Sequence, residues 1–101
     1  DFSGAKKSTS TGPSFSCAAV AKGSIEEIIC QSPSLSEMDL ALNGAYKQAL
    51  VKSSNNPTLK AEQRGWVKGR NECWKEQDKS ACIARNYNER MAELHSKWGV
   101  K

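Results

Sequence analysis

Apolar residues recur at steps of three and four along two long stretches of the chain, residues 33–52 and 79–98. This period places them on one face of an α-helix, so each stretch predicts an amphipathic helix with one buried side. In the first stretch the apolar set is Leu35, Met38, Leu42, Ala45, Tyr46, Ala49 and Leu50. In the second it is Ile83, Tyr87, Met91, Leu94 and Trp98.

Start signals place a third long helix between these two. Asn56 followed by Pro57 puts a capping residue directly before a proline, which is typical of the first turn of a helix. We predict this helix from Pro57 to about Gln77. Its apolar stripe holds few aliphatic residues, so Trp66 should supply much of its buried area.

A short helix is predicted nearer the start of the chain. Ser24 is followed three residues later by Glu27, which is the spacing of a capping box. The helix should stop near Cys30, because Pro33 cannot continue it. At the other end of the chain, Lys79 or Ser80 is expected to cap the last helix and Gly99 to end it.

The pattern therefore predicts an all-α fold, a small disulfide-linked bundle of three main helices plus one short N-terminal helix. No stretch has the alternation typical of a strand. Residues 1–14 are mostly Ser, Thr, Gly and Lys, and we expect a disordered leader there. The helical domain is predicted over residues 15–98, with residues 99–101 as a C-terminal tail.

The cysteines favour disulfide bonds. Four cysteines in 101 residues, an even number, are typical of a small protein from an oxidising compartment. Three pairings are open, and we favour the two that are local in sequence, Cys17 with Cys30 and Cys73 with Cys82. Neither spacing matches a zinc knuckle and the single histidine is not placed as a partner, so no metal and no cofactor is expected.

Charge is divided unevenly along the chain. The formal net charge is +4, but residues 17–44 carry −3 and residues 45–101 carry +6. Mean hydropathy is −0.66, and no apolar run approaches the roughly 20 residues needed to cross a bilayer. We therefore expect no transmembrane segment, while a lipid anchor on a native precursor stays open.

The sequence gives little support for catalysis. His95 has no serine or unpaired cysteine spaced to form a triad with it. Glu26 and Glu27 are adjacent, so on a helix their side chains diverge by about 100° and cannot face each other across a sugar. We predict a protein that is not an enzyme and has no catalytic residue.

Three blocks of residues carry a family resemblance. The first contains Cys17, Cys30, Pro33, Leu35, Asp39, Leu42 and Tyr46; the second contains Glu62, Gln63, Arg64, Trp66, Arg70 and Cys73; the third contains Cys82, Tyr87, Arg90 and Leu94. In these blocks the chain resembles the LprI family, a small periplasmic or lipoprotein domain named after a mycobacterial lysozyme inhibitor. The string Gln-Arg-x-Trp-x₃-Arg-x₂-Cys, over residues 63–73, is the most specific part.

The resemblance implies a periplasmic or secreted protein that binds c-type lysozyme and inhibits it, acting as a monomer. C-type lysozymes are basic enzymes with an acidic cleft, so acidic residues would steer encounter and a lysine could enter the cleft. The candidate partner-binding residues are Lys22, Glu26, Glu27, Glu37 and Asp39. For Glu26 and Glu27, compensation of a helix dipole is an equally good explanation.

The remaining signature residues have two interpretations. Gln63, Arg64, Trp66, Arg70, Tyr87 and Arg90 could form a binding surface. We favour a structural role, with Arg70 and Arg90 pairing carboxylates such as Asp39 or Glu62 across helices and Trp66 in the core. Two other functions stay open: an envelope structural or adaptor module, and a basic binder of anionic polymers. Nucleic acid is not expected, because disulfides argue against an intracellular role.

Overall fold

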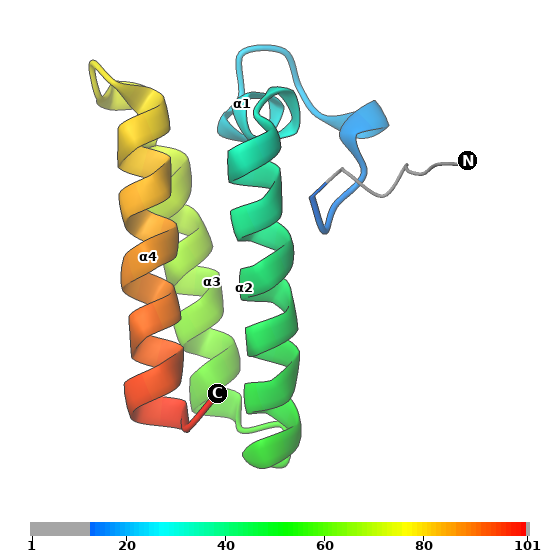
Figure 1. The fold of residues 1–101 in the computed structure, drawn as a ribbon, viewed down its shortest axis with the longest axis vertical. Coiled ribbons are helices and arrows are strands. Elements are labelled where there is room, and N and C mark those ends of the chain that lie inside the picture. Colours follow the sequence, from blue (N-terminus) through cyan, green and yellow to red (C-terminus); the bar gives the residue numbers. More distant parts are fainter. Residues whose placement is uncertain (1–12, 101) are drawn as a thin grey trace.

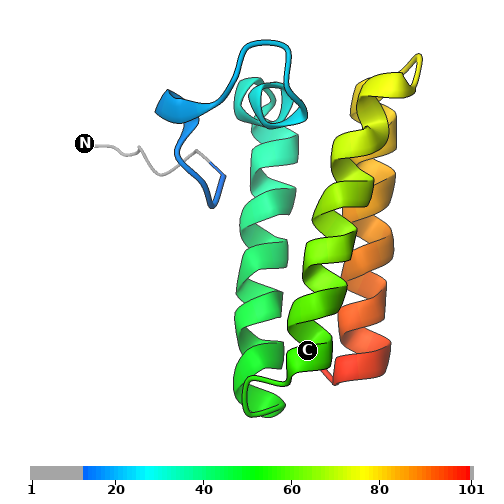
Figure 2. The same cartoon turned by 180° about the vertical axis from the view of Figure 1, so that it is seen from behind.

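Three long helices lie side by side and a short one crosses one of their ends in the computed structural model, which describes residues 13–100 (Figures 1 and 2). In chain order the elements are η2 (Cys17–Ala19), α1 (Ile25–Gln31), α2 (Pro33–Lys52), α3 (Pro57–Asn71), η3 (Glu72–Lys75) and α4 (Lys79–Trp98). No strand occurs in this range. The predicted fold class, three main helices plus one short N-terminal helix, is confirmed.

Side-chain caps begin the helices where the sequence predicted, with one exception. The side chains of Ser24, Ser32 and Asn56 accept hydrogen bonds from backbone N–H groups in the first turns of α1, α2 and α3. The last helix was expected to be capped by Lys79 or Ser80. Asp78 caps it instead, because its Oδ1 accepts from the Ala81 N–H at 3.0 Å, which a lysine ammonium cannot do.

The third helix is shorter than predicted. It ends at Asn71, and the chain continues as the 3₁₀ turn η3 rather than as α-helix to Gln77. In this turn Cys73 is buried and bonded to Cys82 at the start of α4, with 5.7 Å between the two Cα atoms. A tighter turn is needed here because the chain must come back towards α4 within a few residues.

Both predicted disulfides are present. Cys17 bonds to Cys30 with a Cα–Cα distance of 5.9 Å, and Cys73 bonds to Cys82. The first links η2 to the end of α1, and the second joins the α3–η3 segment to α4. No cysteine is left free.

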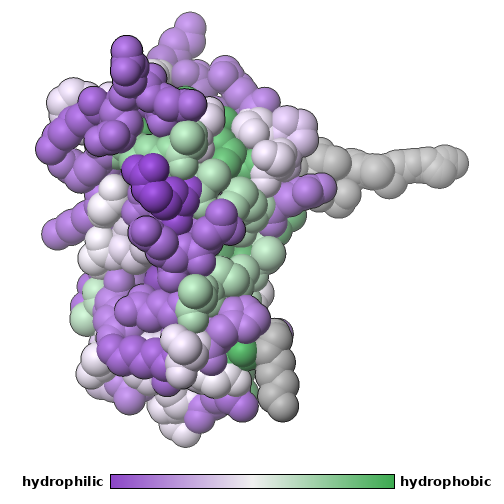
Figure 3. All heavy atoms as spheres, turned by 60° about the vertical axis from the view of Figure 1, so that its left-hand side comes forward, coloured by the Kyte–Doolittle hydropathy of each residue, from purple (hydrophilic) through white to green (hydrophobic). Residues whose placement is uncertain are grey.

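The core lies between the long helices and beneath α1. Its buried members come from every α-helix and include Ile25, Ile29, Leu35, Leu42, Ala49, Leu59, Ile83, Tyr87 and Leu94. On the face seen in Figure 3, hydrophilic side chains cover most of the surface and hydrophobic ones form a broken band between them. Within residues 13–100 no helix is both long and apolar enough to cross a membrane.

Both ends of the described chain belong to the folded unit. Gly99 ends α4 in the left-handed conformation, with φ at 69°. Val100, in the predicted C-terminal tail, is buried, and its N–H donates to the Leu94 carbonyl. At the other end Ser14 is bonded to α2, although it was assigned to the leader. The rest of that predicted leader, residues 1–12, and Lys101 lie outside the described residues.

Candidate functional site

A buried polar network connects the three long helices. The Tyr87 hydroxyl donates to Asp39 Oδ1 at 2.7 Å and accepts from Arg70 Nη1 at 3.2 Å. On the other oxygen of the same carboxylate, Ser14 donates through both its N–H and its hydroxyl. Burial, helped by the hydrogen bond to the Asp39 carboxylate, raises the pKa of Tyr87 well above its ordinary value. We call Ser14, Asp39, Arg70 and Tyr87 the Asp39 network.

A second group of charges joins α3 to α4. Arg90 donates through Nε to Gln63 Oε1 at 2.9 Å and through Nη1 to Glu93, and the same Nη1 lies 3.5 Å from Glu62. Glu62 also accepts from Lys97 and from the Trp98 indole. The hydrogen bond from Lys97, with smaller contributions from Trp98 and Arg90, outweighs partial burial and lowers the pKa of Glu62.

Trp66 packs between α3 and α4. Its indole N–H donates to the Asn86 carbonyl at 3.0 Å, and its ring meets the Tyr87 ring edge-on with centroids 5.0 Å apart. The Arg70 guanidinium lies 5.7 Å from the centre of the Trp66 ring. These contacts agree with a structural role for three of the signature residues, Trp66, Arg70 and Tyr87. Arg64 differs from them, because it is exposed on α3.

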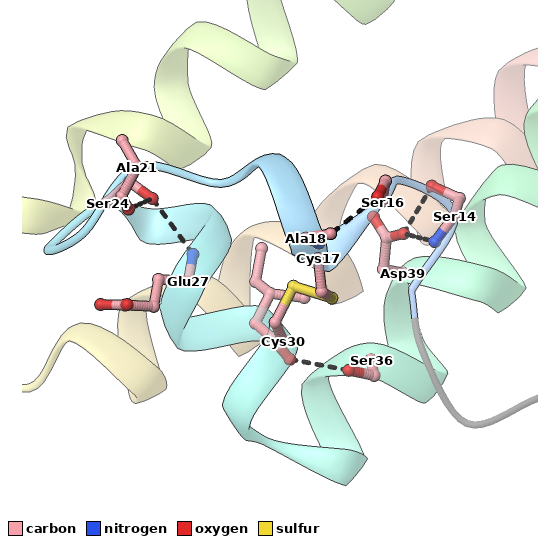
Figure 4. Close-up of a disulfide and its surroundings, with 11 residues drawn as sticks. Ser14, Ser16, Cys17, Ala18, Ala21, Ser24, Glu27, Cys30, Ser36 and Asp39 are labelled. Atoms are coloured by element: carbon pink, nitrogen blue, oxygen red, sulfur yellow. Dashed lines mark hydrogen bonds between the residues drawn. A yellow bond between two sulfur atoms is a disulfide. The ribbon is translucent and has the colours of Figure 1, made fainter. Parts of the chain in front are cut away.

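A loop closed by the first disulfide presents Lys22 to solvent. The loop, residues 20–24, leads from η2 to α1, and the Cys17–Cys30 bond joins η2 to α1 (Figure 4). Ser24 donates through both its N–H and its hydroxyl to the Ala21 carbonyl, at 3.2 and 2.6 Å. Gly23 has a φ of 78°, and its N–H donates to Glu27 Oε1. Lys22 therefore lies on a constrained turn, which we call the Lys22 loop.

The candidate acidic residues do not form one set. Glu37 is exposed on α2, and Glu26 is half-buried on α1. Glu27 is occupied in holding the Lys22 loop through Gly23. Asp39 is only 5 % exposed and has its oxygens bonded within the Asp39 network, so the structure favours its structural alternative. A partner arriving at the surface would meet Glu26 and Glu37 but not Asp39.

Sequence reasoning missed Trp74. It is 58 % exposed on η3 and lines a shallow hollow with Asn71 and with residues 23–26 next to the Lys22 loop. Trp98, at the end of the apolar stripe predicted for the last helix, is half-buried and donates to Glu62. The available signal was the polar run Lys-Glu-Gln-Asp that follows Trp74, because it leaves that end of the helix without an apolar stripe.

Possible metal ligands do not gather anywhere in residues 13–100. No three His, Cys, Asp or Glu side chains in this range group as metal ligands would. His95 is exposed on α4. The polar groups of the two clusters described above bond mainly to one another, and Arg90 Nη2 is buried without a hydrogen-bond partner.

The comparison with protein families decides the family. The model described as "Lysozyme inhibitor LprI" matches residues 17–94, which is most of the chain. The chain belongs to the LprI lysozyme inhibitor family. The match includes both disulfides, the Lys22 loop, α2, α3 and most of α4, so the LprI domain covers most of the folded unit described above.

The curated relatives are mycobacterial. Proteins named "Lipoprotein LprI" from Mycobacterium bovis and Mycobacterium tuberculosis are 29 % identical to this chain over 87 residues. The alignment takes in 86 % of this chain but only 43 % of each relative, so the chain spans less than half of their length. No solved structure matches the chain.

Proposed function

We propose that this domain is an extracytoplasmic, non-catalytic protein that binds c-type lysozyme and inhibits it by occluding its cleft. Membership of a family described as lysozyme inhibitors is the observation that carries the proposal. The two disulfides and the naming of the relatives as lipoproteins support a periplasmic or secreted place of action. A lipid anchor on a longer native precursor is compatible with this place, and the domain would act as a monomer.

The Lys22 loop is the part best suited to enter the cleft. A glycosidase of this kind cleaves its substrate between two carboxyl groups, so an ammonium group placed between them gains favourable charge interactions. The Cys17–Cys30 bond and the hydrogen bonds of Ser24 and Gly23 already hold the loop. Little conformational entropy is then lost on binding, which favours affinity.

Residues around the loop would complete the contact. Trp74 offers an exposed aromatic surface beside residues 23–26, and buried tryptophans are among the commonest anchors of protein interfaces. Glu26 and Glu37 lie on the same end of the molecule and would attract the basic surface of the enzyme. The sequence-based proposal is thereby reduced to Lys22, Glu26 and Glu37, with Trp74 added.

Inhibition is tested directly by clearing of a peptidoglycan suspension. We expect oxidised protein at micromolar excess to slow lysis by a c-type lysozyme and to leave lysis by an unrelated muramidase unchanged. An unchanged rate with the c-type enzyme would remove lysozyme inhibition as the function.

The first prediction concerns Lys22. Lys22→Glu should weaken inhibition at least about 30-fold, since losing a desolvated charge pair costs roughly 2 kcal/mol or more. The matched control is Lys47→Glu, an exposed lysine on α2 that should inhibit like the parent. Inhibition constants for the two variants decide the matter, and equal constants would show that the loop does not enter the cleft.

A further inference from the structure

Two hollows lie between α2 and α3, lined by side chains from both helices; Figure 2 shows these two helices with α4 behind α3. The main hollow has a volume of about 460 Å³ and is lined by Tyr46, Lys60, Gln63, Arg64, Val67 and Lys68. A smaller hollow of about 230 Å³ continues it and shares Gln63 and Val67 with it. Ser14 and Phe15 line this second hollow together with Glu26 of α1 and with Asp39 and Arg70 of the Asp39 network. We call the two hollows together the α2–α3 groove.

One side of the groove is a row of unopposed positive charges. Lys60, Arg64 and Lys68 follow one another at intervals of four residues on α3, about 6 Å apart along the helix. All three are exposed, and none forms an ion pair with the described part of the chain. The carboxylates nearest in sequence are engaged elsewhere: Glu62 pairs with Lys97 and Arg90, and Glu72 pairs with Lys75.

The floor of the groove is apolar. Tyr46 and Val67 are half-buried there and come from the two facing helices. An apolar floor beside a row of cations fits a ligand that is itself amphipathic, with an apolar stripe next to negative charges. A polyanion without apolar groups would leave the floor uncovered.

We propose that the α2–α3 groove binds an acidic amphipathic helix of a partner protein. A helix lying between α2 and α3 would pack as the fourth member of a four-helix arrangement, with its apolar stripe on Tyr46 and Val67. Glutamates four residues apart on such a helix repeat every 6 Å or so, which matches the row formed by Lys60, Arg64 and Lys68.

The main hollow and the row Lys60, Arg64 and Lys68 are separate from the proposed lysozyme contact, whereas Glu26 of that contact lines the smaller hollow. The main hollow lies towards the end of the bundle opposite α1, and its positive charge would repel a basic enzyme. A protein with an inhibitory loop at one end and a helix-binding groove along its side could hold the inhibitor next to an acidic partner in the envelope. Binding of a helix in the α2–α3 groove does not require that the protein inhibits lysozyme.

The test uses a synthetic, fluorescently labelled helical peptide with leucines on one stripe and glutamates beside them. We expect saturable binding in fluorescence anisotropy, weakened about tenfold by Arg64→Glu, because one close charge pair becomes repulsive. Arg85→Glu is the matched control, since Arg85 is exposed on α4, and it should bind like the parent. Equal affinities for the two variants would overturn the proposal.

Two further comparisons identify the ligand class. A peptide with the same glutamates but serines in place of the leucines should bind at least tenfold more weakly, because the apolar floor then stays uncovered. Dextran sulfate competing as well as the leucine peptide would overturn the helix proposal in favour of a simple polyanion site. Arg64→Glu should also retain full lysozyme inhibition, and a loss there would refute the separation of the two surfaces.

Discussion

Glu62 is the residue on which the charges between α3 and α4 converge. It accepts from Lys97 and from Trp98 and lies 3.5 Å from Arg90. These contacts favour the ionised carboxylate, and they lower its pKa below the ordinary value of 4.5. Because the pKa is lower in the folded state, Glu62 contributes stability above the ordinary pKa, and this contribution is lost as the pH falls through the folded value.

The second prediction tests this pH-dependent contribution of Glu62 to stability. Glu62→Gln should lower the free energy of unfolding by about 1 kcal/mol at pH 7, since Lys97 is half exposed and its charge is partly screened. At pH 3 the difference from the parent should be smaller, because the carboxylate is becoming protonated. Urea denaturation at both pH values measures it. Glu89→Gln, at an exposed position on α4, is the control, and a difference independent of pH would contradict the assignment.

Arg64 and Arg70 show how differently two residues of one signature can behave. They are six positions apart on α3, yet Arg70 is buried in the Asp39 network beside the smaller hollow, and Arg64 is exposed at the main hollow of the α2–α3 groove. Six residues correspond to more than one and a half turns, so the two side chains leave α3 on different sides. Residues that belong to one sequence motif therefore do not all lie on one surface of the protein.

Among the helices, α3 depends most on contacts outside its own apolar stripe. Leu59 and Arg70 are its only buried residues, and its attachment to α4 also uses Trp66, the polar contacts of Glu62 and Gln63, and the Cys73–Cys82 bond. The short α1 is attached differently, because Ile25 and Ile29 are buried and its disulfide lies at the surface. The two disulfides should consequently differ in their effects on thermal stability and on inhibition.

The third prediction separates them. Replacing Cys73 and Cys82 by alanine should lower the melting temperature by about 10 °C or more, since such short loops contribute roughly 2–3 kcal/mol. Replacing Cys17 and Cys30 should lower it less, because Cys17 is exposed, but should abolish inhibition by loosening the Lys22 loop. Thermal circular dichroism and the lysis assay measure the two effects. Equal losses of stability and equal inhibition in the two pairs would show that the loop needs no constraint.

On the scale of the whole molecule, charge is separated along the bundle. The end formed by α1 and the start of α2 carries Glu26 and Glu37, whereas the side formed by α3 carries the row of the α2–α3 groove. Fields of this kind act on association rates over roughly a Debye length, about 10 Å at 0.1 M salt.

The fourth prediction tests this separation. Glu37→Lys should slow association with a c-type lysozyme several-fold at low ionic strength, with a smaller effect at 0.5 M salt, because steering is screened. Dissociation should change little, since Glu37 is exposed and a charge at the rim of an interface acts mainly on the association rate. Glu89→Lys makes the same charge change on α4 and should associate like the parent in stopped-flow or surface-binding kinetics. Identical association rates for both variants would remove Glu37 from the steering surface.

The sequence alone predicted the four α-helices. It also favoured the two local cysteine pairs that the structure contains. A cap such as Ser24, Ser32 or Asn56 bonds within three residues, so its effect is readable from neighbours in the chain. Both disulfides join cysteines close in sequence for the same reason, which is that closing a short loop costs little entropy. The end of α3 was misplaced because it depends on where Cys82 lies.

Only the tertiary structure decided which polar residues are available to a partner. Asp39 meets Ser14 and Tyr87 across 25 and 48 positions of sequence, and no local pattern reports such contacts. Burial removed Asp39 from the surface, while the turn at η3 brought Trp74 beside the Lys22 loop. Local hydrogen bonding sets a helix, but exposure is a property of how the helices pack, and that is settled by residues far apart in the chain.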